Sequence, residues 1–344
     1  MSAGPSAAPD RPGAGGGPDY RGRAAAAVSV LQRWYSSRTG LWRSTGWWNA
    51  ANALTSVIRY MQCTGDRAYL DVIERTFRGG QRRHGGFINT FFDDNGWWAL
   101  AWVAAYDLTG GGQYLAAART VFAHNLSGWD GTCGGGLWWN EDHRYKNAVT
   151  NELFLLLAAL LQQRVPGDGQ YLDWALREWR WFDASGLIGP AGLVNDGLTA
   201  GCASNLGPTW TYNQGVILGG LTALHEITGE PGYLRRAELI ADAALGGLTS
   251  PAGILAEPCE DAGCDGDQTQ FKGIFARYLH QLLASSGRPS YRAFLLANAN
   301  SVWENARNRA GQLGLRWGGP FDQADASRQS SALEVLTAAA ALAS

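Results

Sequence analysis

Two kinds of helical segment alternate along the chain. Segments of the first kind carry Arg and Glu on one side and apolar residues on the other, the pattern of a helix with one face in solvent. Examples are Tyr69 to Phe77, Tyr114 to Asn125, Tyr233 to Leu245 and Tyr291 to Arg307. Segments of the second kind are rich in Ala, Leu and Val beyond a polar first turn, which predicts helices buried on most sides. There are six of these: Trp48 to Gln62, Asp94 to Leu108, Asn147 to Gln163, Thr211 to Ile227, Gln268 to Ala284 and Ser327 to Ala343.

A Gly-x-x-x-Tyr motif sets the number of repeating units. Its tyrosines are Tyr20, Tyr69, Tyr114, Tyr171, Tyr233 and Tyr291. Each copy opens one of the half-exposed helices, so six units of two helices are predicted. An open helical solenoid would also repeat, but the polarity contrast between alternate helices favours closure. The prediction is an all-α (α/α)6 barrel of six inner and six outer helices, with short hairpins at the rim at Gly134 to Asn140 and Leu313 to Gly318.

The first residues differ in composition from the rest of the chain. Residues 1–18 are nearly all Gly, Ala, Pro and Ser, which predicts a disordered tail, and residues 19–344 are predicted to form one barrel domain. The apolar run Ala24 to Leu31 continues into polar residues without a clear cleavage site. It is therefore assigned to the first helix and not to a signal peptide. The localisation is therefore left unknown, and the expectation is a cytoplasmic protein or one exported by a route not visible in the sequence.

The charge and the length of the apolar runs exclude nucleic acid and membranes as partners. The net charge is -2 and the Lys and Arg residues are scattered, which does not suit nucleic acid or an anionic membrane surface. The longest apolar run, Leu153 to Leu161, is shorter than the about 20 residues of a membrane-spanning helix.

Five cysteines cannot all pair. Cys63 is predicted to be a buried free thiol, whereas Cys259 and Cys264 could form a small disulfide or, less readily without a nearby His, bind zinc. We expect no metal, no cofactor and a monomer.

Asp93 and Asp94 are the strongest candidates for chemistry. They stand at the start of an otherwise apolar helix, where one Asp suffices as an N-cap. Two neighbouring carboxylates in an apolar setting have pKa values that are pushed apart, which yields an acid and a base from one residue type. In an up-down barrel the polar first turns of all six inner helices lie at one end and converge on one mouth. That convergence favours catalysis over capping.

The surroundings of this pair suggest glycoside hydrolysis. The chain has 16 Trp and 12 Tyr, many of them in segments expected at loops or helix starts, and their flat apolar faces suit sugar rings. Glycosidases use two carboxyl groups on one glycosidic bond. Adjacent Cα atoms are about 3.8 Å apart, which favours the roughly 5 Å carboxyl separation of retaining enzymes. An Asp-Asp-x-x-Asp magnesium motif is absent because Trp97 occupies its fifth position.

The stretch Phe92 to Ala101 resembles the signature of family 76 glycoside hydrolases, the endo-α-1,6-mannanases. Six further blocks match in order over about residues 20–344: Trp47 to Asn52, Gly134 to Trp139, Lys146 to Glu152, Asn195 to Gly197, Thr211 to Gly215 and Phe271 to Phe275. The resemblance implies an (α/α)6 barrel and a retaining mechanism without a metal, with Asp93 as nucleophile and Asp94 as general acid/base. It implies sugar contacts, about half of which we expect to touch substrate, at Trp48, Asn49, Asn52, Trp97, Trp98, Trp139, Asn147, Asn151, Asp196, Tyr212, Asn213, Gln214 and Lys272.

The expected function is therefore that of a retaining, endo-acting hydrolase of α-1,6-linked mannan, with an oligo- or polysaccharide of the α-mannan type as its substrate. Two alternatives remain open. A transglycosylase, or a hydrolase of another α-linked glycan, would use the same two carboxylates. A catalytically inactive carbohydrate-binding protein would not need both, so the intact pair argues against it.

Overall fold

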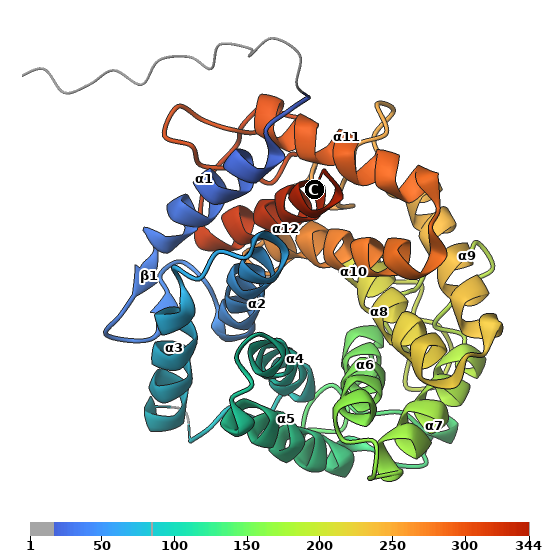
Figure 1. The fold of residues 1–344 in the computed structure, drawn as a ribbon. Coiled ribbons are helices and arrows are strands. Elements are labelled where there is room, and N and C mark those ends of the chain that lie inside the picture. The colour runs from blue at the N-terminus through green and yellow to red at the C-terminus, as the bar shows by residue number, and fades with distance from the viewer. Residues whose placement is uncertain (1–16, 84, 344) are drawn as a thin grey trace, which may run out of the picture.

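The computed structural model describes residues 17–83 and 85–343, so nearly all of the predicted tail lies outside the described residues. Within these ranges, twelve α-helices form two concentric rings (Figure 1). This confirms the predicted (α/α)6 barrel. None of the described helices is both long enough and apolar enough to cross a membrane.

The inner ring closes on itself. Each inner helix contacts the next, and the last contacts the first. The inner helices are α2 (Trp47–Thr64), α4 (Phe92–Thr109), α6 (Ala148–Arg164), α8 (Thr211–Thr228), α10 (Phe271–Ser286) and α12 (Ala326–Leu342). The outer helices are α1 (Tyr20–Gln32), α3 (Leu70–Arg83), α5 (Gly112–Asn125), α7 (Gln170–Ala184), α9 (Pro231–Gly247) and α11 (Pro289–Asn305).

The Gly-x-x-x-Tyr motif marks the passage from an inner helix to the next outer helix. Its glycines end four inner helices with φ between 64° and 76°, at Gly65, Gly110, Gly229 and Gly287. Glycine adopts this left-handed conformation without a Cβ clash, which is why it stops helices. The exception among the described turns is α6, whose C-cap is Val165 and not the glycine of the motif.

The rim segments pair less regularly than predicted. The named strands are β1 (Tyr35–Ser36) and β2 (Leu41–Trp42), which pair antiparallel, and the short 3-10 helices are η1 (Leu126–Gly128), η2 (Thr132–Gly134) and η3 (Gln268–Gln270). The two segments predicted as hairpins form isolated bridges instead, such as Trp129 to Leu137 and Arg307 to Leu313. In the first of them, Gly134, Gly135 and Gly136 have φ of 78°, 144° and 83°, which interrupts an extended strand.

Four cysteines form two disulfides, both outside the helical barrel. Cys259 pairs with Cys264, as considered from the sequence, and Cys133 pairs with Cys202, which the sequence did not suggest. Cys63 is a free thiol but is only partly buried.

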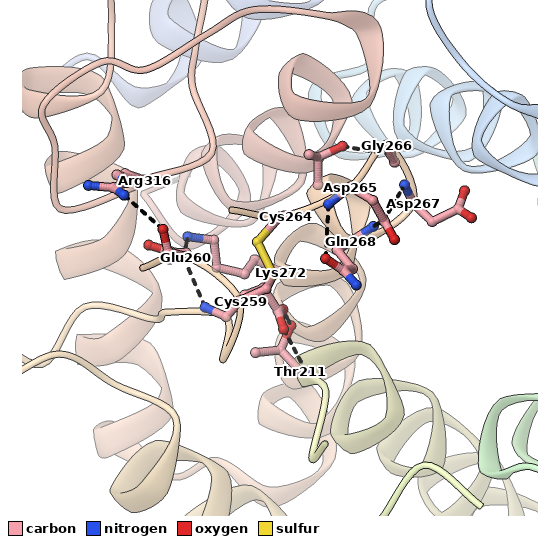
Figure 2. The surroundings of a disulfide bond; sticks show 12 residues. Thr211, Cys259, Glu260, Cys264, Asp265, Gly266, Asp267, Gln268, Lys272 and Arg316 are labelled. Carbon is pink, nitrogen blue, oxygen red and sulfur yellow. Dashed lines mark hydrogen bonds and ion pairs between the residues drawn. A yellow bond between two sulfur atoms is a disulfide. The ribbon is translucent and has the colours of Figure 1, made fainter. Parts of the chain in front are cut away.

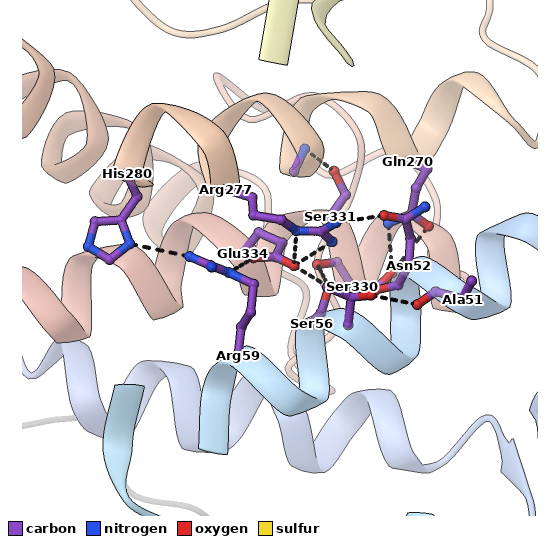
Figure 3. Close-up of polar contacts among 12 residues, drawn as sticks. Ala51, Asn52, Ser56, Arg59, Gln270, Arg277, His280, Ser330, Ser331 and Glu334 are labelled. Carbon is purple, nitrogen blue, oxygen red and sulfur yellow. Dashed lines mark hydrogen bonds and ion pairs between the residues drawn. The ribbon is translucent and has the colours of Figure 1, made fainter. Parts of the chain in front are cut away.

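A buried ionic network ties three inner helices together (Figure 3). Glu334 on α12 accepts hydrogen bonds from Arg277 on α10 (2.6 and 2.9 Å) and from Ser56 on α2 (2.8 Å). Arg277 also donates to Oδ1 of Asn52 (2.9 Å). Burial opposes ionisation of Glu334, but the guanidinium groups of Arg277 and Arg59 outweigh it and hold the pKa of this carboxyl below its ordinary value. The network therefore stays charged inside the barrel wall.

Replacing Glu334 should destabilise the protein strongly. Glu334→Ala leaves the Arg277 charge buried without its partner, which we expect to cost about 3–5 kcal/mol in the free energy of unfolding. Glu304→Ala is the matched control, because Glu304 pairs with Arg23 at 3.7 Å with 60% of its side chain exposed and should cost less than about 1 kcal/mol. Denaturant unfolding measures both, and similar losses in the two variants would contradict the assignment.

Candidate active site

One pocket of about 250 Å³ lies where five inner helices begin. Its walls come from the first turns of α2, α4, α6, α8 and α10 and from the loops that precede them. The lining residues are Trp48, Asp93, Trp97, Trp139, Tyr145, Asn147, Val149, Asp196, Tyr212, Asp267 and Phe271. The polar starts of these five helices thus meet at one mouth, as the up-down alternation predicted, whereas no residue of the sixth inner helix, α12, lines the pocket.

Neither carboxylate of the Asp93-Asp94 pair caps its helix. The N-cap of α4 is Phe91, and no side chain makes a capping hydrogen bond there. The incoming loop is held by Asn95 instead, whose amide accepts from the backbone N–H of Asn89 (2.8 Å) and donates to its carbonyl (3.0 Å). Both aspartates are therefore left for another role.

The two carboxylates have different surroundings. Asp93 lines the pocket and its Oδ2 accepts from the indole N–H of Trp139 (3.0 Å), whereas its Oδ1 is buried without a partner among the described residues. Asp94 is not part of the lining, and its Oδ2 accepts from the amide of Asn89 (2.7 Å).

Both pKa values are raised. Burial and then the neighbouring Asp94 charge raise the pKa of Asp93. Burial also raises the pKa of Asp94, opposed by the Asn89 hydrogen bond and reinforced by the charge of Asp267. Because both pKa values are raised, the pair still holds one proton at a pH where a single exposed carboxyl would have lost its own. One carboxyl of the pair can then donate that proton while the other stays ionised.

Aromatic rings form one side of the pocket. The ring of Trp48 lies 5.6 Å from that of Trp97 at 27°, and the ring of Tyr212 stacks on Phe271 at 3.8 Å and 8°. Trp139, with 36% of its surface exposed, lies beside Asp93. Flat apolar faces with polar groups at their edges suit a ligand that has both, such as a pyranose ring.

The loops that carry Trp139 and Asp196 are fixed by polar contacts. The buried ammonium group of Lys146 donates to Asp130 (2.8 Å) and to the carbonyls of Gly135 (2.7 Å) and Gly136 (2.8 Å). The Tyr145 hydroxyl donates to Asp196. The Cys133–Cys202 disulfide joins the loop that carries Trp139 to the loop that carries Asp196. The pocket wall is therefore held in place before any ligand binds.

Six of the thirteen predicted sugar contacts line the pocket: Trp48, Trp97, Trp139, Asn147, Asp196 and Tyr212. The other seven do not line it: Asn49, Asn52, Trp98, Asn151, Asn213, Gln214 and Lys272. Asn52 accepts from Arg277, and Lys272 is fully buried against Glu260. Trp98 packs against Trp102 in the core.

Two of the seven share a geometry that explains why polar residues recur at buried helix starts. Asn151 accepts from the backbone N–H of Leu137 (2.6 Å) and donates to its carbonyl (3.1 Å). Gln214 does the same for Val194 (2.7 and 2.8 Å). Asn95 makes the equivalent pair with Asn89. We call these three residues the amide clamps, because each holds a rim loop over the inner ring.

Four lining residues were not singled out from the sequence: Tyr145, Val149, Asp267 and Phe271. Phe271 opens one of the matched blocks, and Asp267 belongs to a polar helix start, so both carried a signal. Val149 lies inside the matched block Lys146 to Glu152 but is apolar, and Tyr145 carried no signal beyond its nearness to Asn147.

The sequence of this chain is similar to those of several known proteins. The sequence profile described as "Glycosyl hydrolase family 76" matches residues 23–344. A mannan endo-1,6-alpha-mannosidase of Candida albicans is 26% identical over 329 residues, covering 85% of this chain and 72% of that protein. One of Eremothecium gossypii is 30% identical over 263 residues, covering 68% and 57%. The chain thus spans little more than half the length of several curated fungal relatives.

Solved structures give the same fold over nearly the whole chain. An alpha-1,6-mannanase of Salegentibacter sp. superposes with a TM-score of 0.87 at 28% identity, covering 95% of this chain and 100% of that one. A variant of that mannanase with two adjacent aspartates changed to alanine is inactive and was solved in complex with alpha-1,6-mannotetrose. A protein of Listeria innocua superposes with a TM-score of 0.86 at 28% identity, covering 94% and 97%.

The raised pKa of Asp93 predicts how stability depends on pH. A carboxyl whose pKa is higher in the folded than in the unfolded state, where it is about 3.9, makes the folded protein less stable as pH rises through the interval between the two values. Asp93→Asn removes this loss, so the variant should gain melting temperature relative to the wild type at pH 8 and show no such gain at pH 4.

Melting curves between pH 4 and 8 measure this difference. The control Asp142→Asn removes an exposed carboxylate and should follow the wild type. If Asp93 instead stabilised the start of α4, Asp93→Asn would melt lower at pH 8.

Proposed function

The chain belongs to glycosyl hydrolase family 76, and from this premise we propose that it is a retaining, endo-acting glycoside hydrolase that cleaves α-1,6-linked mannan with Asp93 and Asp94. The observation that carries the proposal is the pair of neighbouring carboxylates, free of any capping role, at the start of α4 beside an aromatic pocket. The inactive Salegentibacter variant, which lacks two adjacent aspartates, supports assigning the chemistry to this pair.

In the proposed mechanism the two aspartates have separate roles. Asp93 attacks the anomeric carbon and forms a covalent glycosyl-enzyme, while Asp94 gives its proton to the departing glycosidic oxygen. Asp94, now ionised, then removes a proton from the water that releases the sugar from Asp93. Burial raises the pKa of both aspartates, so the pair can keep the one proton that a general acid needs, and the Trp139 N–H, which lowers the pKa of Asp93, holds its carboxylate in position for attack.

The proposed substrate contacts are those residues of the lining that present an aromatic face or a polar edge: Trp48, Trp97, Trp139, Asn147, Asp196 and Tyr212. The pocket volume of about 250 Å³ lies below the roughly 300–1,000 Å³ of sites that enclose drug-sized ligands. It therefore encloses a small part of a polysaccharide and leaves the rest outside, in keeping with a long mannan. The names of the fungal relatives and the oligosaccharide bound by the bacterial mannanase support the α-1,6 linkage.

Substitution of either aspartate should remove turnover without unfolding the protein. We expect Asp93→Asn to release no detectable reducing ends from α-1,6-mannan, because no nucleophile remains. Asp94→Asn should lower the rate about 10²–10⁴-fold, the contribution of a general acid. The control Asp173→Asn removes an exposed carboxylate on outer helix α7 and should match the wild type. Wild-type rates in either active-site variant would overturn the assignment.

The stereochemistry of the product tests the mechanism separately. A proton NMR time course with a linear α-1,6-mannooligosaccharide should show the α anomer of the new reducing end before mutarotation. Initial β product would keep the substrate but contradict Asp93 as nucleophile. Products longer than the starting oligosaccharide would indicate transfer to sugar in place of water.

A further inference from the structure

A third carboxylate faces the pocket from the loop between α9 and α10. Asp267 is part of the lining, and its Oδ1 accepts from the indole N–H of Trp48 (2.8 Å), 219 positions away in the chain. Resting on the function proposed above, we propose that Asp267 is a further substrate-binding residue, which fixes the Trp48 ring with one oxygen and accepts hydrogen bonds from sugar hydroxyl groups with the other.

The loop that carries Asp267 is anchored by other residues (Figure 2). Oδ1 of Asp265 accepts the backbone N–H groups of Asp267 (3.0 Å) and Gln268 (2.9 Å). The Cys259–Cys264 disulfide closes the preceding turn, where the carbonyl of Glu260 accepts from Arg316 (2.7 Å). The loop therefore keeps its shape without the Asp267 carboxylate, which leaves that carboxylate available to a ligand.

The contact with Trp48 places the carboxylate at the edge of the aromatic wall. Trp48 is partly exposed and lies between Trp97 and Phe271, with ring centroids 5.6 and 6.1 Å away. A sugar ring stacked on this wall turns its hydroxyl groups outward, toward the ring edges. An ionised carboxylate at the edge is an acceptor-only group that can take hydrogen bonds from two neighbouring hydroxyls.

Asp267 also acts on the proposed acid. The titratable groups that face Asp94 are Asp93 on the same helix and Asp267 from the loop before α10, and the Asp267 charge adds to burial in raising the pKa of Asp94. Facing Asp267 are Asp265 on its own loop and Trp48 and Asn49 from α2. Removing the Asp267 charge should therefore let Asp94 lose its proton at lower pH.

Asp267→Asn separates these roles from a structural one. The new amide oxygen can still accept the Trp48 N–H, so the wall keeps its geometry while the charge is lost. We expect KM for an α-1,6-mannooligosaccharide to rise roughly tenfold, as for a lost hydrogen bond to a charged group, with kcat changed less. The alkaline limb of kcat/KM should move to lower pH. The control Asp261→Asn removes an exposed carboxylate from the same loop and should leave KM and the pH profile unchanged.

Binding to an inactive background tests Asp267 independently of turnover. Calorimetry with α-1,6-mannotetraose compares the double variant Asp93→Asn/Asp94→Asn with the same protein carrying Asp267→Asn or Asp261→Asn. We expect Asp267→Asn to weaken Kd roughly tenfold and Asp261→Asn to leave it unchanged. Equal Kd values with and without Asp267→Asn would overturn the proposal, as would no binding by the double variant. If the wild type cleaves no mannan, the proposed function fails while this comparison still decides the role of Asp267.

Discussion

The mouth of the barrel depends on side-chain amides that hydrogen-bond to backbone. Each rim loop must pass over the inner ring, where its N–H and C=O groups lose contact with water, and each such group left unpaired costs about 1–3 kcal/mol. The amide clamps Asn95, Asn151 and Gln214 offer one acceptor and one donor to a single loop residue, as a neighbouring strand would. The chain thereby gains rigid loops at the mouth without building a sheet, and these loops carry or border the pocket-lining groups Trp139 and Asp196.

The helices were predictable because their signals are local. Gly65 ends α2 and Tyr69 precedes α3, and both residues act through their own backbone conformation or their immediate neighbours. The polar helix starts could also be recognised in the sequence, but the direction in which each polar side chain points could not be predicted from it. Asn147 lines the pocket, whereas Asn151, one turn later, turns to the loop. The contribution of Asp267 depends on a contact with Trp48 that only the closed ring creates, so sequence spacing could not have ranked it.

The charges of the mouth are sorted by sign. Carboxylates line the pocket at Asp93, Asp196 and Asp267, and no Lys or Arg is among the lining residues. The cations nearby, such as Lys146 and Lys272, are buried in the supporting walls and neutralised there by Asp130 and Glu260. A pocket of this kind suits a neutral sugar whose anomeric carbon gains positive charge as the glycosidic bond breaks. Burial and the same clustering of carboxylates raise the pKa values of Asp93 and Asp94. These raised pKa values affect both the protonation state of the site and the stability of the fold at neutral pH.

Both disulfides lie in rim segments, and neither joins two helices of the barrel. The Cys133–Cys202 bond links loops 69 residues apart, and such crosslinks form where thiols are oxidised. In protein made in a reducing host the mouth would lack two covalent ties, whereas no helix of the barrel would lose one. Titration of thiols in the unfolded protein is then the proper criterion for a correctly assembled preparation: one free thiol per chain, not five.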